Sequence, residues 1–296
     1  MAANYWESSQ RKYWTFTKKE LSEMRKAMEQ ENQQLVSQYP LPDRRLLNIY
    51  LSYRELGKLG RRMNARQQVL ATAQVYMRRF YLKREIRTTN PYLVLCTAFY
   101  LACKMEEAPQ HIRVVVGEAR QFWSDCVTSD TSKLGECEFQ LISEMNSQLI
   151  IHHPYRDLTE LQTSLGLTQE EVSLAWSILN DHYLTDLPLL HPPHVIAITA
   201  AFLAVVLKPG QGGQLQAQNI QAAMQHALSA QTGSTGGQQN RIQKLMTWLA
   251  ESSVSIEAIV DCTQELISLY EIWESFNDKA CKEAVTRFVK ARGLDK

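Results

Sequence analysis

The side chains best suited to a binding site in this sequence are a small set of neighbouring charges. Lys104, Glu106 and Glu107 end the segment 90–107, NPYLVLCTAFYLACKMEE, in which nearly every position from Leu93 to Ala102 is apolar or small. A lysine beside two carboxylates offers both signs of charge at one surface spot. With apolar surface next to it, such a spot is a plausible arrangement for gripping a helix of a partner protein.

Glu138 is a further charge in an informative position. It lies in the apolar stripe of a helix expected over 132–148, whereas Glu136 points the opposite way. A carboxylate on an apolar face must be paired or lie at a protein interface. Two simpler roles stay open: Glu138 forms a private pair with a nearby Arg or Lys, and Lys104 is a cation that the helix dipole favours in the last turn.

Motifs for catalysis are missing from the sequence. It contains no GxxxxGK[ST], GxGxxG or GxSxG, and no carboxylate pair has a setting that would raise a pKa for acid–base chemistry. The histidines lack the spacing of metal ligands, because His152 and His153 are adjacent and diverge, while His191 and His194 flank two prolines. We therefore expect no enzyme, no metal site and no cofactor.

Composition limits the class of protein and of partner. The chain has 296 residues, of which 45% are hydrophobic and 21% charged, which is typical of a globular protein of one or two domains. The net charge of +1 gives no overall attraction to nucleic acid or acidic lipid, so we expect neither as a direct partner. The longest apolar run, 195–207, is shorter than the about 20 residues that span a bilayer, and residues 1–20 are too charged for a signal peptide.

The six cysteines contain no CxxC pair. Cys96 and Cys103 are expected on one face of the helix 91–105, which favours core packing, and the overall pattern favours a reducing compartment.

Almost the whole chain has the pattern of helix. Asn90 and Pro91 mark a helix start, because the asparagine side chain caps free amides and proline needs no amide hydrogen bond there. The helix that follows is apolar all round and is expected to be the central rod of a helical domain. Thr17 and Glu20 predict a capping box at the start of a helix that runs toward Gln38. Further helices are expected at about 43–56, ended by Gly57 and Gly60, and at 64–82, 109–123, 132–148, 241–250, 255–276 and 281–292.

The second half of the chain repeats the first at an offset of 102 residues. Pro91 matches Pro193 at this offset, and a period near 100 residues indicates a duplicated domain rather than a solenoid. The charged end is not repeated, because Lys104 falls on Val206. The expected organisation is N-terminal helices over 1–40, a first repeat over 41–153, a second repeat over 154–276 and a C-terminal helix over 277–296.

Three further segments have a distinctive composition. Residues 209–240 are rich in Gly, Gln, Ser and Ala, which predicts a flexible surface insertion, with a transient helix near 219–229. Among the early aromatics, Trp6 and Trp14 must pack on the body of the protein or on a partner. A basic cluster lies around the end of the helix 64–82; a solvated face or a landing site for an acidic protein accounts for it better than nucleic-acid binding. Its members are Arg78, Arg79, Lys83, Arg84 and Arg87.

Together these segments resemble the cyclin family, and within it the transcriptional cyclins. LACKMEE, residues 101–107, resembles the cyclin-box signature in which a lysine and an acidic pair follow an apolar helix. ECEFQLISEMNSQLIIHHPYRDL, residues 136–158, resembles the fifth helix and the link to the second repeat in transcriptional cyclins. LAWSILNDHYLTDLPLLHPP (174–193) and NYWESSQRKYW (4–14) are similar to their second repeat and N-terminal helix. The resemblance covers nearly the whole chain outside 209–240, an elaboration of the kind that fungal members carry.

The resemblance implies a fold and a function. The fold is all-α, with two tandem five-helix cyclin-box repeats and extra N-terminal and C-terminal helices. The function is that of a nuclear regulatory subunit which binds and activates a cyclin-dependent kinase of the Mediator kinase module and so regulates RNA polymerase II transcription. Other Mediator kinase-module subunits would be further partners. The family's kinase-docking lysine and fifth-helix glutamate fall on Lys104 and Glu138, with Glu107 as a supporting contact and Trp6 as a further candidate.

Two departures from the cell-cycle cyclins favour the transcriptional branch. The MRxxxxxW motif is absent from residues 44–60, so a substrate-recruiting patch is not expected, and Arg78 replaces an acidic residue of those cyclins.

The alternative functions are a Mediator scaffold without kinase activation, a transcription factor IIB-like DNA-binding adaptor and a free-standing helical enzyme. The adaptor would need a basic repeat and usually an N-terminal zinc ribbon, and residues 4–40 contain no cysteine.

Overall fold

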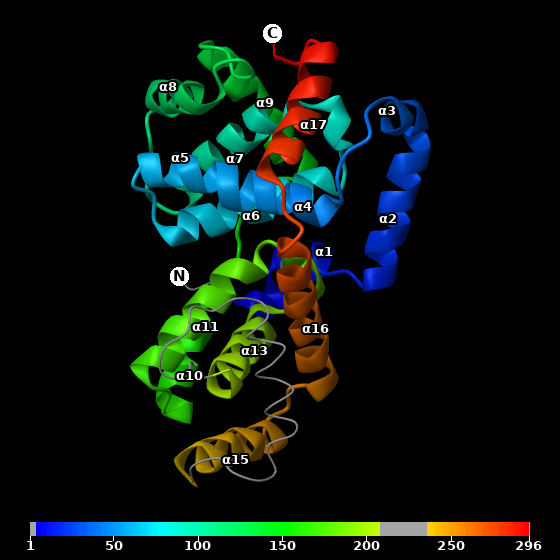
Figure 1. Ribbon diagram of the computed structural model, residues 1–296. Coiled ribbons are helices and arrows are strands. Elements are labelled where there is room, and N and C mark those ends of the chain that lie inside the picture. The colour runs from blue at the N-terminus through cyan, green and yellow to red at the C-terminus, as the bar shows by residue number, and fades with distance from the viewer. Residues whose placement is uncertain (1–3, 208–235, 296) are drawn as a thin grey trace. The chain divides into compact units, whose positions relative to one another are not determined.

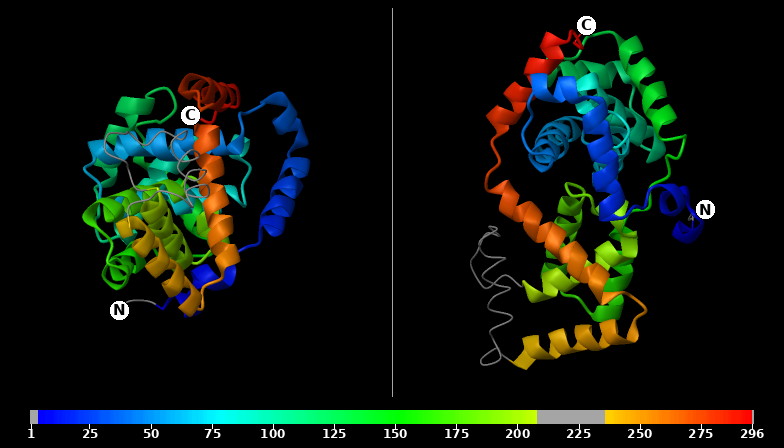
Figure 2. Two further views of the ribbon diagram at one scale, coloured as in Figure 1. Left: turned by 60° about the horizontal axis from the view of Figure 1, so that its bottom comes forward. Right: turned by 90° about the vertical axis from the view of Figure 1, so that its right-hand side faces the viewer.

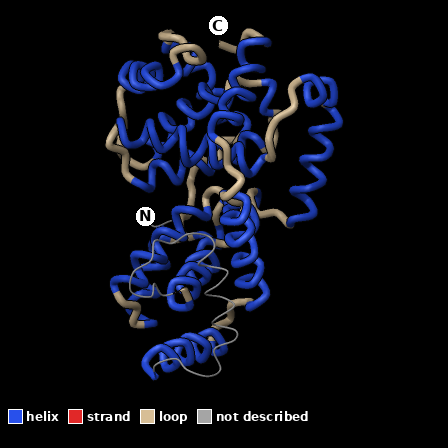
Figure 3. Tube along the Cα trace, viewed as in Figure 1, coloured by secondary structure: helices blue, strands red, loops and turns tan. Residues whose placement is uncertain are grey.

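The structure, a computed structural model, describes residues 4–207 and 236–295. Every regular element in these two ranges is a helix, and neither range contains a strand (Figure 3). None of the helices described there is both long and apolar enough to cross a membrane. The chain divides into two compact units, unit 1 with residues 1–152 and 276–296, and unit 2 with residues 153–275.

Unit 1 contains the first repeat and the helices that precede and follow it (Figure 1). The repeat consists of one long first helix and four others: α4 (Arg44–Asn48), the π-helical η2 (Ile49–Glu55) and α5 (Leu56–Arg62) in direct succession, then α6 (Gln67–Tyr81), α7 (Pro91–Met105), α8 (Ile112–Trp123) and α9 (Thr131–Glu144). The additional elements are η1 (Tyr5–Glu7), α1 (Ser9–Tyr13), α2 (Lys18–Glu31), α3 (Gln33–Gln38), η3 (Ile86–Thr88) and α17 (Asp278–Ala291). Within this unit, α2 lies along the outer side (Figure 2).

Helix α7 is the central helix of unit 1, as its all-apolar sequence predicts. It packs against α5, α6, α8, α9 and η2, and most of its residues are buried. Its start is capped as expected, because Asn90 Oδ1 accepts from the amides of Tyr92 at 3.1 Å and Leu93 at 3.4 Å. The same asparagine donates to the carbonyls of Cys126 at 2.6 Å and Leu294 at 3.1 Å, so the cap also joins α7 to two distant segments.

The first helix of the repeat does not end where the sequence predicts. Gly57 and Gly60 lie inside α5, which continues to Arg62. Gly60 is needed for packing rather than for termination, because a Cβ built there would lie 2.5 Å from a Leu70 methyl carbon. The chain turns instead at Asn64, whose φ of 48° is left-handed, and α6 therefore begins later than the expected residue 64.

These two glycines give a matched pair of stability predictions. Gly57→Ala is expected to raise the free energy of unfolding by about 1 kcal/mol, since alanine favours helix and its Cβ would meet only Arg61 Nη1 at 3.5 Å. Gly60→Ala is expected to lower it by about 1–3 kcal/mol, because the Leu70 side chain must move within a packed interior. Urea unfolding of both variants checks this. If both variants changed the free energy of unfolding equally, the Leu70 side chain would be able to move aside without destabilising the protein.

Unit 2 repeats the helix pattern of the first repeat. Its helices are α10 (Tyr155–Leu165), α11 (Gln169–His182), the short α12 (Leu187–Leu190), α13 (Pro193–Val206), α15 (Gly236–Glu251) and α16 (Ile256–Trp273). Helices α11 and α13 begin 102 residues after α6 and α7, as the sequence offset predicts. The apolar α13 is central here too, packed against α10, α11, α15 and α16. The fold is therefore all-α, with two five-helix repeats and extra helices at both ends.

Several expected boundaries change in the structure. The helix predicted over 17–38 breaks at Asn32 into α2 and α3, and those predicted over 109–123 and 132–148 are shorter, as α8 and α9. Helix α15 begins at Gly236, so residues 236–240 are helical although their composition predicts a flexible insertion. The remainder of that insertion, with its transient helix near 219–229, lies outside the described residues.

The cysteines belong to the cores, as expected for Cys96 and Cys103. All six are free and buried. Burial raises the pKa of the Cys96 and Cys103 thiols, which keeps these groups protonated at neutral pH. They contribute packing rather than reactivity.

Candidate functional site

Lys104 and Glu138 contact each other directly. Lys104 lies in the last turn of α7 and Glu138 in the middle of α9, two helices that pack side by side. Lys104 Nζ forms an ion pair with Glu138 Oε1 and also lies 4.7 Å from the centre of the Tyr100 ring. The two charges, which are 34 residues apart in the sequence, therefore make one feature.

The two members of this pair differ in exposure. The Lys104 side chain is 40% exposed and the Glu138 side chain 13%. A carboxylate so far removed from water needs a charged or hydrogen-bonding partner, and the lysine supplies one. The pair thus gives Glu138 the private partner that its position requires, while still presenting a lysine at the surface.

Glu106 and Glu107 end α7 in different ways. Glu106 is the C-cap residue, and its Oε1 accepts a hydrogen bond from Thr72 Oγ1 at 2.5 Å. Glu107 is exposed and left-handed, with φ of 52°. The amide of Ala108 donates to the carbonyl of Cys103 at 2.9 Å, the bond of a Schellman ending, in which the left-handed position usually carries glycine. The strained backbone therefore holds a carboxylate in the solvent three residues after Lys104.

Trp6 and Trp14 lie in different environments. Trp6 is 51% exposed on η1, where the Arg11 guanidinium carbon lies 4.9 Å from its ring centre and Tyr5 packs edge-on. Trp14 is 2% exposed, and its Nε1 donates to Gln148 Oε1 at 2.6 Å. Trp14 therefore packs on the body of unit 1, whereas Trp6 offers a large apolar surface.

The basic cluster is not the solvated face that the sequence indicated. Arg78, Arg79 and Arg87 are buried, and Arg84 pairs with Glu144 at 2.6 Å. Arg79 and Arg87 can be buried because their guanidinium groups donate to the backbone carbonyls of Gln148 and Tyr39. A landing site made of all five basic residues is therefore excluded.

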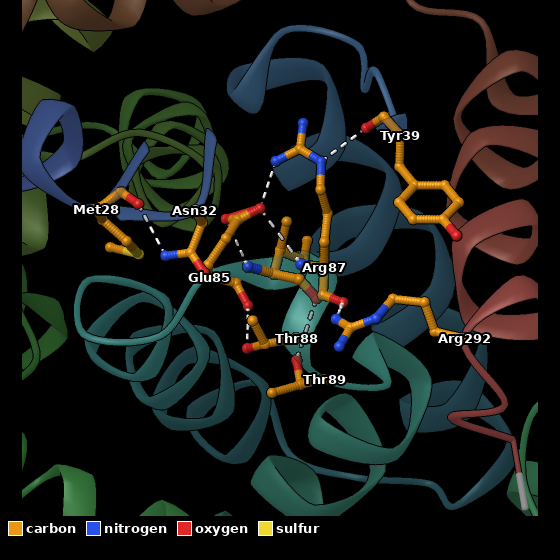
Figure 4. A network of polar contacts seen from close by, with 9 residues as sticks. Met28, Asn32, Tyr39, Glu85, Arg87, Thr88, Thr89 and Arg292 are labelled. Atoms are coloured by element: carbon orange, nitrogen blue, oxygen red, sulfur yellow. Dashed lines mark hydrogen bonds and ion pairs between the residues drawn. The ribbon is translucent and has the colours of Figure 1, made fainter. Parts of the chain in front are cut away.

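Arg87 shows what one of these arginines does instead. It forms an ion pair with Glu85, and its Nε donates to the carbonyl of Tyr39 at 2.7 Å (Figure 4). The guanidinium of Arg292, just beyond α17, donates to the carbonyl of Arg87. This network joins three segments of unit 1 that are far apart in the sequence.

Arg79 is the most unusual of the basic residues. It is fully buried; Nη1 donates to the carbonyl of Gln148 at 2.8 Å, and the guanidinium carbon lies 4.7 Å from the ring centre of Trp14. Its Nε and Nη2 have no hydrogen-bond partner among the described residues. Burial lowers the pKa of Arg79 to about 9, so the group stays charged at neutral pH. Trp14 and Gln148 together stabilise this cation.

The histidines considered as metal ligands make different contacts. His191 Nε2 lies 2.9 Å from Asp261 Oδ2, and His153 Nδ1 lies 2.5 Å from Tyr183 Oη. In residues 4–207 and 236–295, no three His, Cys, Asp or Glu side chains gather in a way that would hold a metal ion.

One residue next to the pair escaped the sequence reasoning. Phe139 is 77% exposed, the largest fraction among the large hydrophobic side chains described as exposed. It follows Glu138 directly and lies outside the apolar stripe of its helix. An aromatic residue off the stripe is the signal that could have identified it.

Comparison with known proteins identifies relatives along the whole chain. A model of the cyclin N-terminal domain matches residues 12–150. Curated fungal proteins described as RNA polymerase II holoenzyme cyclin-like subunits are 60% identical over 305 residues in Aspergillus fumigatus, 61% over 302 in Aspergillus oryzae and 51% over 346 in Neurospora crassa. Each of these alignments covers 100% of both chains.

Solved structures show the same fold in more distant proteins. A chain of the CAK complex from Chaetomium thermophilum has a TM-score of 0.62 at 19% identity, with 97% of this chain and 88% of that chain covered. A chain of the yeast TFIIK complex has a TM-score of 0.58 at 19% identity, with 88% and 100% covered. At such identities the likeness concerns the fold alone.

Proposed function

Because the chain belongs to the cyclin family, we propose that it is a transcriptional cyclin of the cyclin C type, which binds and activates a Mediator-associated cyclin-dependent kinase in the nucleus. The first cyclin box, 41–153, carries the kinase-docking surface, and the second, 154–276, carries the insertion. Other subunits of the Mediator kinase module are further partners. The fungal relatives are described as cyclin-like subunits of an RNA polymerase II holoenzyme, which supports this proposal.

The observation that carries the proposal is the Lys104–Glu138 pair. It combines a half-exposed cation with a carboxylate that is already ordered and largely out of water. A kinase helix that brings its own charges to this pair meets groups that need little further ordering, which lowers the entropy cost of binding. Glu107 and Trp6 supply further contacts, a carboxylate and a large aromatic surface, on the same unit.

Activation follows from preferential binding to one kinase conformation. An active protein kinase needs an ion pair between the glutamate of its regulatory helix and the lysine of its ATP site. A cyclin that binds this helix only in its inward position shifts the population toward the active form. The cyclin itself needs no catalytic residue for this role.

The direct test uses purified Mediator-associated kinase and this chain. We expect a saturable complex by calorimetry, and phosphorylation of an RNA polymerase II C-terminal repeat peptide that rises with occupancy of the kinase. Tight binding without any rise in activity would support the scaffold alternative. Absence of binding would reject the proposal.

Glu107 gives a prediction in which stability and binding change in opposite directions. Glu107→Gly is expected to raise the free energy of unfolding by about 1 kcal/mol, because glycine adopts the left-handed conformation without a Cβ penalty. The same variant is expected to bind the kinase several-fold more weakly, since one charged contact is lost. Thermal melting and calorimetry measure the two effects.

Asn64→Gly is the matched control, because Asn64 is also left-handed but lies in the turn after α5. It is expected to leave binding unchanged. If Glu107→Gly binds as tightly as wild type, Glu107 is not a kinase contact.

A further inference from the structure

The outer side of α17 carries a local excess of positive charge. Helix α17 lies on the outside of unit 1 and packs against η2 with its apolar side, which belongs to the core of this unit (Figures 1 and 2). Between residues 279 and 290 the helix has a single acidic residue, Glu283, and four basic residues, Lys279, Lys282, Arg287 and Lys290. The net charge of the whole chain is only +1, so the excess belongs to this helix and not to the overall composition.

The four basic residues form one surface, the basic face of α17. The three lysines occupy positions i, i+3 and i+11, which lie within about 80° of each other round the helix axis and extend over about 16 Å. The side chain of Lys279 is 86% exposed and that of Lys290 49%, and Lys282 and Arg287 are exposed as well. An open hollow of about 830 Å³ follows these residues. A charged segment of another molecule therefore has both access and space here.

One carboxylate of the chain already lies at the end of the basic face. Asp125, just beyond α8, has its Oδ2 2.9 Å from Lys290 Nζ, although the Asp125 side chain is 70% exposed. The hydrogen bond and the charge of Lys290 lower the pKa of Asp125, and the charge of Lys282 lowers it further. The basic face thus favours the ionised form of a carboxylate that reaches it.

The other charges of the basic face have little use inside the chain. Lys279 forms an ion pair with Glu283 at 3.9 Å, but these side chains are 86% and 68% exposed, and such a pair contributes little to stability. Arg287 Nη2 donates to the carbonyl of Pro40 at 3.2 Å, a bond that uses one of the five N–H donors of the guanidinium. A partner can therefore engage these groups without breaking contacts that hold the fold together.

The Lys290 end of the basic face is remote from the proposed kinase dock. Asn90, at the start of α7, donates to the carbonyls of Cys126, next to Asp125, and of Leu294, just beyond α17. Lys104 lies in the last turn of the same helix, about 20 Å further along its axis. The basic face and the Lys104–Glu138 pair are thus linked to opposite ends of α7.

We infer that the basic face of α17 is a docking surface separate from the kinase dock, and that its occupant is an acidic protein segment with carboxylates three and four residues apart on one side of a helix. Such a segment matches the spacing of the lysines, and charge complementarity of this kind gives specificity and fast association. A nucleic acid fits less well, because Glu283 and Asp125 repel a backbone of uniform negative charge. The inference goes beyond the proposed function and does not depend on it.

Binding of a defined acidic peptide to the entire chain tests the inference. The probe is a fluorescent, alanine-based helical peptide of about 20 residues with glutamate at positions i, i+3, i+7 and i+11. The comparison peptide has the same composition, with its glutamates spread evenly round the helix. Fluorescence anisotropy should show roughly tenfold tighter binding of the first peptide, because several weak ion pairs form together only when the carboxylates share one side. The difference should shrink as salt is added.

The chain offers a closely matched pair of charge reversals. Lys279→Glu with Lys282→Glu is expected to weaken binding of the acidic peptide roughly tenfold or more, with little change in melting temperature, because both side chains are exposed. Lys19→Glu with Lys26→Glu in α2 is the control. Lys19 forms the same kind of pair, with Glu23 at 3.9 Å, and is 85% exposed. The control makes the same change in net charge and should leave peptide binding unchanged.

Several outcomes would overturn the inference. Absence of binding by the acidic peptide would do so, as would equal binding of the two peptides or equal losses in the α17 and α2 variants, which would mean that only net charge matters. Tighter binding of a DNA duplex of similar length would assign the basic face to nucleic acid.

Kinase affinity separates this inference from the proposed function. The α17 variant should bind the Mediator-associated kinase normally, whereas Lys104→Glu should lose the kinase and keep the acidic peptide. Loss of kinase binding in the α17 variant would show that the basic face is part of the kinase dock, and the inference of a separate surface would then be wrong.

Discussion

Replacing Lys104 by glutamate is expected to weaken kinase binding by tens to thousands of fold, equivalent to about 2–5 kcal/mol, and to abolish activation. The reason is that Glu138 is only 13% exposed and loses the cation that compensates it, while the docking surface changes sign. The measurement is calorimetric affinity together with kinase activity at saturating cyclin. The variant is also expected to melt earlier, because two carboxylates then face each other.

The exchange of both charges separates docking from internal structure. In Lys104→Glu with Glu138→Lys the ion pair within the chain is restored, so the melting temperature should recover toward that of wild type. Binding should not recover, because the kinase then meets each charge in the wrong place. If binding recovered together with the melting temperature, the Lys104–Glu138 pair would only stabilise the cyclin fold and would not contact the kinase.

The second large effect concerns Trp14. Trp14→Ala is expected to lower the free energy of unfolding by about 3–5 kcal/mol and the melting temperature by roughly 6–20 °C. The buried ring is lost, Gln148 loses the Nε1–H donor, and the Arg79 cation loses the aromatic face 4.7 Å away. Thermal melting followed by circular dichroism measures this change.

Trp6 is the matched control for Trp14, eight residues earlier on the same segment. Because Trp6 is 51% exposed, Trp6→Ala is expected to change the free energy of unfolding by less than about 1 kcal/mol and to weaken kinase binding instead. Equal loss of stability in both variants would contradict the distinction between a structural and a binding tryptophan. Unchanged kinase affinity in Trp6→Ala would remove Trp6 from the proposed docking surface.

Local patterns in the sequence were sufficient for the helices and their starts. The Asn90 cap, the Thr17–Glu20 capping box and the apolar run after Pro91 all have the predicted roles in the structure. Each depends on residues within one or two turns of each other, so periodicity and side-chain chemistry determine the outcome. The duplication was equally readable, since α6 and α7 recur as α11 and α13 at the same offset.

Glycines and arginines were misjudged because their roles depend on distant neighbours. Gly57 and Gly60 looked like helix ends, but Leu70 from α6 fills the space beside Gly60. Arg79 looked like part of a solvated face, but Trp14 and Gln148 enclose it. Leu70 lies on the next helix, and Trp14 and Gln148 lie 65 and 69 residues from Arg79, so the local composition around each residue does not indicate these contacts.

The sequence by itself determined the all-α repeated fold, the central helix of each repeat and the two charges worth testing. Only the tertiary structure decided that Lys104 and Glu138 contact each other, and that Trp14 is internal while Trp6 is exposed. The physical reason is that helix formation depends on neighbours within a few residues, whereas pairing and burial depend on how α7 and α9 pack. A side chain's exposure is a property of that packing, and it separates a core residue from a binding residue.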